Sequence, residues 1–123
     1  MRYSLLMYYP EPSTDQLDPG TIEEAMRAFQ VYAAMLSDAG VLASAEVLQP
    51  SIATTTLRLV DGAPHVQDGP FADSKEQLAG TFVIDVDDVD AALTWARSCP
   101  ALPWGSIEIR PTATRFVDGS WTA

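Results

Sequence analysis

The sequence predicts a single α+β domain, residues 1–123, in which two helices cover one face of an antiparallel sheet. Three observations lead to this prediction. Two segments carry apolar residues at helical spacing, several others carry the β-branched and aromatic residues typical of strands, and the two kinds of segment alternate along the chain. Hydrophobic residues make up 47% of the 123 residues, which is enough for one core.

A strand, a loop and a long helix open the chain. Residues 3–9 are apolar on both alternating faces, so this strand is expected to be covered on both sides. Residues 10–20 contain three prolines and form a loop. Asp18 is expected to cap a helix that begins at Pro19 and stops at Gly40. The apolar positions of this helix are Ile22, Met26, Phe29, Ala33 and Leu36.

The middle of the chain contains strands and turns. Residues 41–48 and 53–60 are predicted to be strands joined by a proline-containing turn. Asp61-Gly62 is a strong turn signal, and Val66 carries a short returning strand. Residues 68–78 are expected to form a loop with one helical turn.

A strand, a short helix and a final strand complete the pattern. Residues 80–86 form the strand, and Asp87 is expected to cap a helix over residues 88–98. Pro100 ends that helix, and residues 106–110 form the last strand. The helix has its apolar positions at Ala92, Leu93, Trp95 and Ala96.

This order of elements predicts a ferredoxin-like split βαβ arrangement, with both helices on one face of the sheet. The other sheet face still needs cover, because Leu6 and Tyr8 alternate with the residues that meet the helices. Two such sheets packed face to face would provide it, so we expect a homodimeric α/β barrel. The tail, residues 112–123, is polar apart from Phe116, Val117 and Trp121, and Trp121 suggests that it packs on something.

Composition excludes several classes of partner. The chain has 17 acidic and 7 basic residues, a formal charge of -10, which repels nucleic acid and anionic membrane surfaces. Its apolar N-terminal run is too short to span a membrane. Cys99 is the only cysteine, so no intrachain disulfide and no thiolate metal cluster is expected, and a reduced cytoplasmic setting fits.

The most informative motif begins at Asp68. An aspartate normally bonds the backbone N–H two residues later, but that residue is Pro70, which has no N–H. The Asp68 carboxylate is therefore expected to reach the Phe71 N–H, find a side-chain partner or face a ligand. Gly69 permits a backbone angle closed to other residues and a close approach of another chain or ligand.

The rest of this segment leaves two interpretations open. Phe71 is expected to anchor the loop, and Lys75, the only lysine, has Glu76 beside it. In one interpretation the segment is a rigid turn, in which Asp68 caps backbone and Lys75 forms an ion pair. In the other, these groups edge a pocket.

Charged residues on the last strand are a second candidate. Alternation places Glu108 and Arg110 on the face opposite Ile107 and Ile109. If the isoleucines meet the helices, the charges enter the space between two sheets, where they must be paired or bind something polar. Both a paired Glu–Arg ladder and a polar site remain open. Other charged residues that can join them are Glu46, Arg58 and Asp85.

The remaining candidates are weaker. His65 is either a proton shuttle near Asp68 or a solvated hairpin histidine. Cys99 has no neighbouring histidine and is interpreted as a small buried hydrophobe. The acidic residues between 85 and 90 lack the glycine and terminal glutamate of an EF-hand, so helix capping explains them better than a metal.

The block Asp-Gly-Pro-Phe-Ala-Asp-Ser-Lys-Glu, residues 68–76, followed by Leu-Ala-Gly, resembles the signature of the DGPF branch of the YCII-related proteins. Residues 84–93 and 107–111 resemble its later blocks, and the N-terminal strand and residues 46–50 match its general pattern, so the resemblance covers nearly the whole chain. It implies a dimeric ferredoxin-like α/β barrel.

The resemblance implies less about function. Most DGPF proteins are uncharacterised, and some are encoded beside, or fused to, sigma factors of the extracytoplasmic type. A related branch includes a dehydrochlorinase associated with a His–Asp pair. This chain departs from that pattern, because its single histidine, His65, lies in the hairpin before Asp68; the resemblance does not carry that activity over.

Two functional hypotheses follow, and the sequence leaves open whether the protein is an enzyme. The first is a barrel that binds or transforms a small polar molecule without a cofactor or a metal. In it Asp68 or Glu108 serves as base, and Lys75 or Arg110 holds an anionic substrate. Its pocket is edged by Asp68, Gly69, Pro70, Phe71, Lys75, Glu76 and Arg110. The second is a non-catalytic regulatory module associated with a sigma factor.

Overall fold

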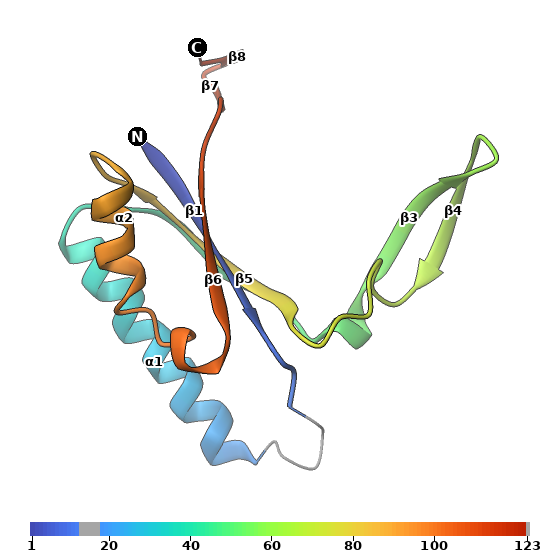
Figure 1. The fold of residues 1–123 in the computed structure, drawn as a ribbon, viewed down its shortest axis with the longest axis horizontal. Coiled ribbons are helices and arrows are strands. Elements are labelled where there is room, and N and C mark those ends of the chain that lie inside the picture. Colours follow the sequence, from blue (N-terminus) through green and yellow to red (C-terminus); the bar gives the residue numbers. More distant parts are fainter. Residues whose placement is uncertain (13–17, 123) are drawn as a thin grey trace.

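The structure is a computed structural model that describes residues 1–12 and 18–122. The chain folds into two α-helices and eight strands over the described residues, and a long hairpin projects from the body (Figure 1). The elements of the body are β1 (Arg2–Tyr9), α1 (Pro19–Asp38), β2 (Leu42–Val47), β5 (Gln77–Asp85), α2 (Val89–Ala96) and β6 (Ser106–Pro111). The hairpins are β3 (Thr55–Val60) with β4 (Ala63–Asp68), and β7 (Phe116–Val117) with β8 (Ser120–Trp121). Two 3₁₀ turns, η2 (Ser51–Ala53) and η3 (Leu102–Trp104), complete the list.

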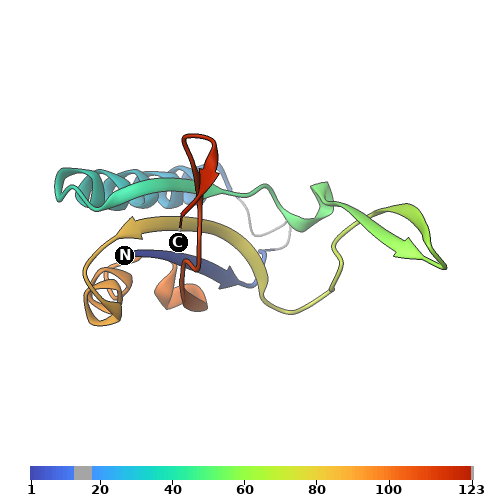
Figure 2. The same cartoon turned by 90° about the horizontal axis from the view of Figure 1, so that it is seen from above.

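The body is a four-stranded antiparallel sheet in the order β2-β5-β1-β6, with both helices on one face (Figures 1 and 2). The prediction of an α+β fold is confirmed. The central pair is β1 and β5, with Leu5 opposite Phe82 and Tyr3 opposite Ile84. Strand β5 begins three residues earlier than predicted, because its pairing with β1 continues past an irregularity in register after Met7.

The core lies between this sheet and the helices. Leu5, Met7 and Ile84 are fully buried on the helix-facing side of the sheet. Phe82 packs against two aromatic rings of α1, Phe29 and Tyr32, with ring centroids 6.2 and 5.0 Å apart. The other buried residues of the core include Tyr3, Leu36, Val86, Ala92, Ala96, Cys99 and Ala101. Cys99 is buried as predicted, and burial raises the pKa of its thiol.

Strand β2 approaches β5 closely at Gly80. A β-carbon at this position would overlap the carbonyl oxygen of Glu46 and lie 2.8 Å from the Met7 Cε. Glycine is therefore required here by the space between the strands, since any larger residue would push β2 away from the sheet.

Helix α1 begins as predicted and extends beyond the sheet. The Asp18 carboxylate accepts a hydrogen bond of 2.8 Å from the Thr21 N–H, and Pro19 occupies the first turn. The predicted apolar face is correct at Phe29 and Leu36, but Ile22 and Met26 are exposed because the first turns lie beside the edge strand β2 and not over the sheet.

The predicted cap of α2 was off by one residue. Asp88, not Asp87, adopts the extended backbone of a cap and accepts a hydrogen bond of 2.9 Å from the Ala91 N–H. Asp90 lies in the first turn, where a carboxylate also suits the helix dipole.

Strands β3 and β4 pair with each other and belong to a separate sheet, so residues 41–48 and 53–60 do not lie side by side as neighbours. We call residues 55–68 the arm. It projects away from the helices on the far side of the sheet (Figures 1 and 2). The returning strand is longer than predicted, since it spans six residues around Val66. The loop after it contains bends but no helical turn between Asp68 and Gln77.

The tail forms the small β7–β8 hairpin. Trp121 packs edge-to-face on Phe116, with ring centroids 5.5 Å apart, and both rings are otherwise exposed. No helix in the described part of the chain is long and apolar enough to cross a membrane.

Candidate functional site

The face of the sheet turned away from the helices is uncovered, and we call it the open face. Register and alternation place the following residues on it: Arg2, Ser4, Leu6, Tyr8, Ser44, Glu46, Thr81, Val83, Asp85, Ser106, Glu108 and Arg110. Among them Leu6, Tyr8 and Val83 are only half-buried. The open face therefore carries apolar side chains among its charged ones, whereas the sheet face that remains in water is usually polar.

The alternation predicted for β6 is confirmed. Ile107 and Ile109 pack against the core, while Glu108 and Arg110 point to the open face. The Arg110 Nη1 lies 3.8 Å from the Glu108 Oε1, and both side chains are more than half exposed. At that distance and exposure the pair contributes little stability, so most of the donors of Arg110 remain available.

A second arginine lies at the same end of the open face. Arg2 is opposite Asp85 across β1 and β5, and Arg110 is opposite Ser4, two residues along β1 from Arg2. The Arg2 Nε is buried and has no hydrogen-bond partner. The sequence analysis missed Arg2, although its alternation with Leu6 and Tyr8 in β1 was the signal that would have placed it here.

Asp85 carries the clearest electrostatic perturbation of the open face. A hydrogen bond of 3.0 Å from the N-terminal amine, followed by the charges of that amine, Arg2 and Arg115, lowers the pKa of its carboxyl. The carboxylate form of Asp85 is thus favoured.

At the base of the arm, the turn is held by Gly69 and not by Asp68. The Gly69 N–H donates to the Thr54 carbonyl at 2.8 Å, and the Gly69 carbonyl accepts from the Thr56 Oγ1 at 2.7 Å. Gly69 has φ +98°, as its predicted special backbone angle requires. Within residues 1–12 and 18–122 the exposed carboxylate of Asp68 accepts no hydrogen bond, from the Phe71 N–H or elsewhere.

The loop after Gly69 is closed by backbone contacts. The Ser74 Oγ donates to the Glu76 carbonyl, and the Gln77 Nε2 donates to the carbonyls of Ala72 and Ser74. Phe71 does not anchor the loop in the core: its ring is 73% exposed and lies 5.5 Å below the guanidinium of Arg58. Lys75 forms no ion pair in the described part of the chain.

The predicted site residues form two groups. Residues 68–76 lie where β1 ends, because Gln77 pairs with Tyr9, whereas Arg110 lies near the start of β1. Four to five strand residues separate these ends, roughly 15 Å along the sheet. His65 is opposite Arg58 in the exposed arm and belongs to neither group. A single chain therefore does not bring Asp68, Lys75 and Arg110 around one point.

The chemistry available on the open face and at the base of the arm is that of charged side chains. Among the described residues no three or more His, Cys, Asp and Glu side chains come together to hold a metal ion. Guanidinium groups suit carboxylate or phosphate recognition, and Glu108 or Asp68 is an exposed carboxylate that can accept a proton.

Comparison with known proteins agrees with this architecture. Residues 1–114 match the YCII-related domain. The chain belongs to the YCII-related family. A relative from Rhizobium meliloti (strain 1021) is 39% identical over 115 residues, which are 92% of this chain and 93% of that protein, and it is itself named as uncharacterised. The similarity therefore extends over nearly the whole of both chains, and the name of the relative states no activity.

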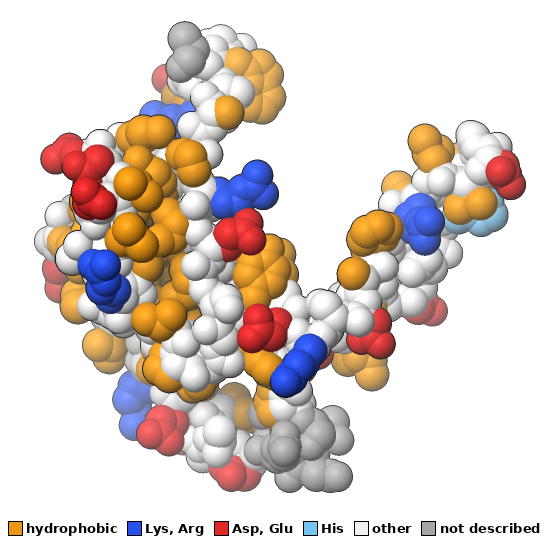
Figure 3. All heavy atoms as spheres, viewed as in Figure 1, with side chains coloured by type: hydrophobic (Ala, Val, Ile, Leu, Met, Phe, Trp, Pro, Cys, Tyr) orange, Lys and Arg blue, Asp and Glu red, His pale blue; other side chains and the backbone are white. Residues whose placement is uncertain are grey.

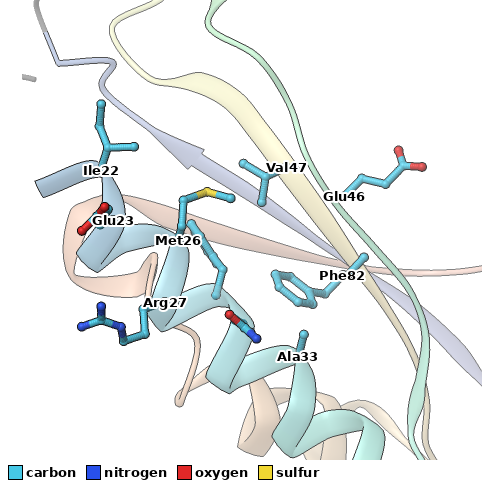
Figure 4. A pocket seen from close by; sticks show the side chains of 11 residues that line it. Ile22, Glu23, Met26, Arg27, Ala33, Glu46, Val47 and Phe82 are labelled. Carbon is cyan, nitrogen blue, oxygen red and sulfur yellow. The ribbon is translucent and has the colours of Figure 1, made fainter. Parts of the chain in front are cut away.

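This YCII-related chain also has a groove on its helix side. It lies between α1 and the edge strand β2, has a volume of about 490 Å³, and is open to solvent. Figure 4 shows Met26, Phe82 and Val47 around it, and Glu46 pointing away from it. The remaining lining residues are Ile22, Glu23, Arg27, Phe29, Gln30, Ala33 and Ala45. The exposed turns of α1 thus border an apolar surface that the sequence pattern had placed in the core.

Proposed function

We propose that this YCII-related protein is a homodimer in which two open faces pack together as a ferredoxin-like α/β barrel, and that a small polar molecule binds between the two sheets. The observation that carries this proposal is the open face itself. Leu6, Tyr8 and Val83 remain partly exposed to water unless something packs on them. A second copy presents the same residues, so two copies packed face to face would bury this apolar surface on both.

The arm supports the same association. Six extended residues reach about 20 Å, and stacked sheets lie about 10 Å apart, so a partner sheet on the open face lies alongside the arm. Figure 3 shows the notch between body and arm, with charged side chains on the side of the sheet. An isolated two-stranded hairpin is marginally stable in water, so the arm needs a neighbour such as the partner.

The pocket would lie where charges interrupt the apolar contact. Arg110 and Glu108 enter the space between the sheets from β6, and their loose pair leaves donors and acceptors for a ligand. Asp68, Gly69, Pro70, Phe71, Lys75 and Glu76 would edge the space from the base of the arm. If the protein is catalytic, Asp68 or Glu108 is the base and Arg110 or Lys75 holds the anionic group of the substrate.

The dimer is tested by size-exclusion chromatography with light scattering. The wild-type chain is expected to be a dimer, and Leu6→Asp is expected to be a folded monomer by circular dichroism, because a charge would be buried between the sheets. Val31→Asp is the matched control, since Val31 is exposed on the helix side and its variant is expected to remain dimeric. A monomeric wild-type chain would contradict the proposal.

The pocket is tested by screening small carboxylic acids and phosphate esters for an increase in melting temperature. A compound that stabilises the wild type is expected to lose this effect in Arg110→Ala. Arg97→Ala, at the exposed end of α2, is the control and should keep it. A dimer that no compound stabilises would remove the pocket from the proposal and leave the barrel.

The groove between α1 and β2 favours a second candidate, a non-catalytic module that binds a sigma factor of the extracytoplasmic type. The groove is apolar, open and on the side that the barrel leaves free. In this alternative, Met26→Glu would abolish binding of a purified sigma factor of this type in a titration, and Arg110→Ala would not. The reverse pattern, or no binding by the wild type, argues against it.

A further inference from the structure

We propose that a pair of arginines at one corner of the open face, Arg2 and Arg110, is an anion-binding site that takes a carboxylate or phosphate group of the ligand. We call this pair the arginine corner. The proposal deepens the proposed function and rests on it, because it locates the charged end of the pocket and defines the chemical class of the ligand.

Register places these two residues close together. Arg2 and Arg110 lie on adjacent strands and on the same face, and Arg110 is opposite Ser4, two residues from Arg2. Such diagonal neighbours have β-carbons about 7–8 Å apart, a distance that two arginine side chains easily span.

The charge distribution makes the corner exceptional for this chain. Only 7 residues are Lys or Arg against 17 acidic ones, yet two of the seven lie here on adjacent strands. Asp85 and Glu108 are the acidic side chains on the same part of the open face. With the N-terminal amine, which pairs with Asp85 at 3.0 Å, three positive groups face two carboxylates here, in a chain whose overall charge is strongly negative.

The arginines are not consumed by partners in the chain. Over residues 1–12 and 18–122, Arg2 forms no ion pair within 4.0 Å, and the contact of Arg110 with Glu108 is long, at 3.8 Å. The Arg2 Nε is out of contact with water and without an acceptor. The Arg2 side chain as a whole is only half-buried, and arginine guanidinium groups suit an oxyanion because they donate charge-assisted hydrogen bonds in bidentate pairs.

Dimerisation is expected to make anion binding at the arginine corner more favourable. Packing a second sheet on the open face removes water from the corner, and unpaired guanidinium groups would then oppose association. An anion bound there offsets their charge, so anion binding and dimerisation are expected to reinforce each other.

Inorganic phosphate is the probe, titrated against chloride at equal ionic strength. Nuclear magnetic resonance or calorimetry measures the dissociation constant, and light scattering on the same samples measures the dimer. The wild type is expected to bind phosphate saturably and to dimerise more tightly with it. Arg2→Gln and Arg110→Gln should each raise the dissociation constant about tenfold, because each removes a charge-assisted bidentate contact. Arg97→Gln is the control and should change it little.

The outcomes separate this assignment from the proposed function. A dimer that binds no phosphate, or whose Arg2→Gln and Arg110→Gln variants bind it as the wild type does, overturns the arginine corner and leaves the barrel. A monomer at every phosphate concentration overturns the barrel as well. Arg110→Gln is expected to fold as the wild type does, since this side chain is exposed. A loss of phosphate binding in this variant would therefore not come from misfolding.

Discussion

Gly69 closes the turn at the base of the arm with its backbone. Its φ of +98° lies in a region that L-residues rarely adopt, while a β-carbon there would meet no atom within 4 Å. Glycine is therefore favoured at this position by the backbone angle and not by a lack of space. This explains why the neighbouring Asp68 carboxylate is left without a local partner: the turn does not need it.

Gly69→Ala is expected to destabilise the protein by about 1 kcal/mol or more, because alanine is strained at this angle. Thermal or urea unfolding measures the change. Gly69→Asn should lose less, since asparagine tolerates positive φ better than alanine does. An unchanged melting temperature in Gly69→Ala would contradict this account of the turn.

At the scale of elements, the cap of α2 is decided by the backbone conformation before the helix and not by residue type alone. Asp87 and Asp88 are equally good caps in sequence. Asp88 is chosen because Val86 is buried at the end of the sheet and its N–H bonds the Met1 carbonyl at 2.9 Å, which holds the chain in extended form up to that point.

The cap predicts a contrast between neighbouring aspartates. Asp88→Ala is expected to cost about 1 kcal/mol, because the Ala91 N–H loses its acceptor. Asp87→Ala is the control and should be nearly neutral. Chemical denaturation of the two variants side by side measures the difference, and equal losses would show that the cap is shared.

Helix α1 shows the limit of periodicity. Its apolar stripe predicts burial along the whole length, yet only Phe29, Tyr32 and Leu36 are buried. The Tyr32 hydroxyl donates to the Trp95 carbonyl at 2.7 Å, so this residue joins the two helices, and burial raises its pKa well above the usual range. Beyond the edge of the sheet, the apolar residues Ile22 and Met26 of the same helix face line the groove between α1 and β2.

At the scale of the whole molecule, the arm is the feature that a single chain does not explain. One of its faces carries Leu57, Leu59 and Val66, which are 69, 72 and 70% exposed. The arm pairs only with itself, in a sheet of its own. In the proposed dimer this apolar face packs on the partner subunit.

Val66→Asp is therefore expected to weaken the dimer, raising its dissociation constant at least about tenfold, because a buried carboxylate would replace an apolar contact. Gln67→Asp is the matched control, since it adds the same charge to the next residue on the opposite face of β4. Analytical ultracentrifugation over a dilution series compares them. Equal dimerisation of the two variants would place the arm outside the interface.

The sequence by itself determined the element types, the α+β class, the cap and stop of the first helix, and the inward and outward faces of the last strand, because these depend on periodicity and on the chemistry of a few residues. It also identified the family through the block at residues 68–76. Tertiary structure alone decided that 41–48 and 53–60 separate into two sheets, and that Arg2 joins Arg110. It also decided that Asp68, at the base of the arm, lies near the end of β1 opposite to that of Arg110. Pairing and register bring together residues far apart in the chain, and local patterns carry no information about which distant strand will be the neighbour.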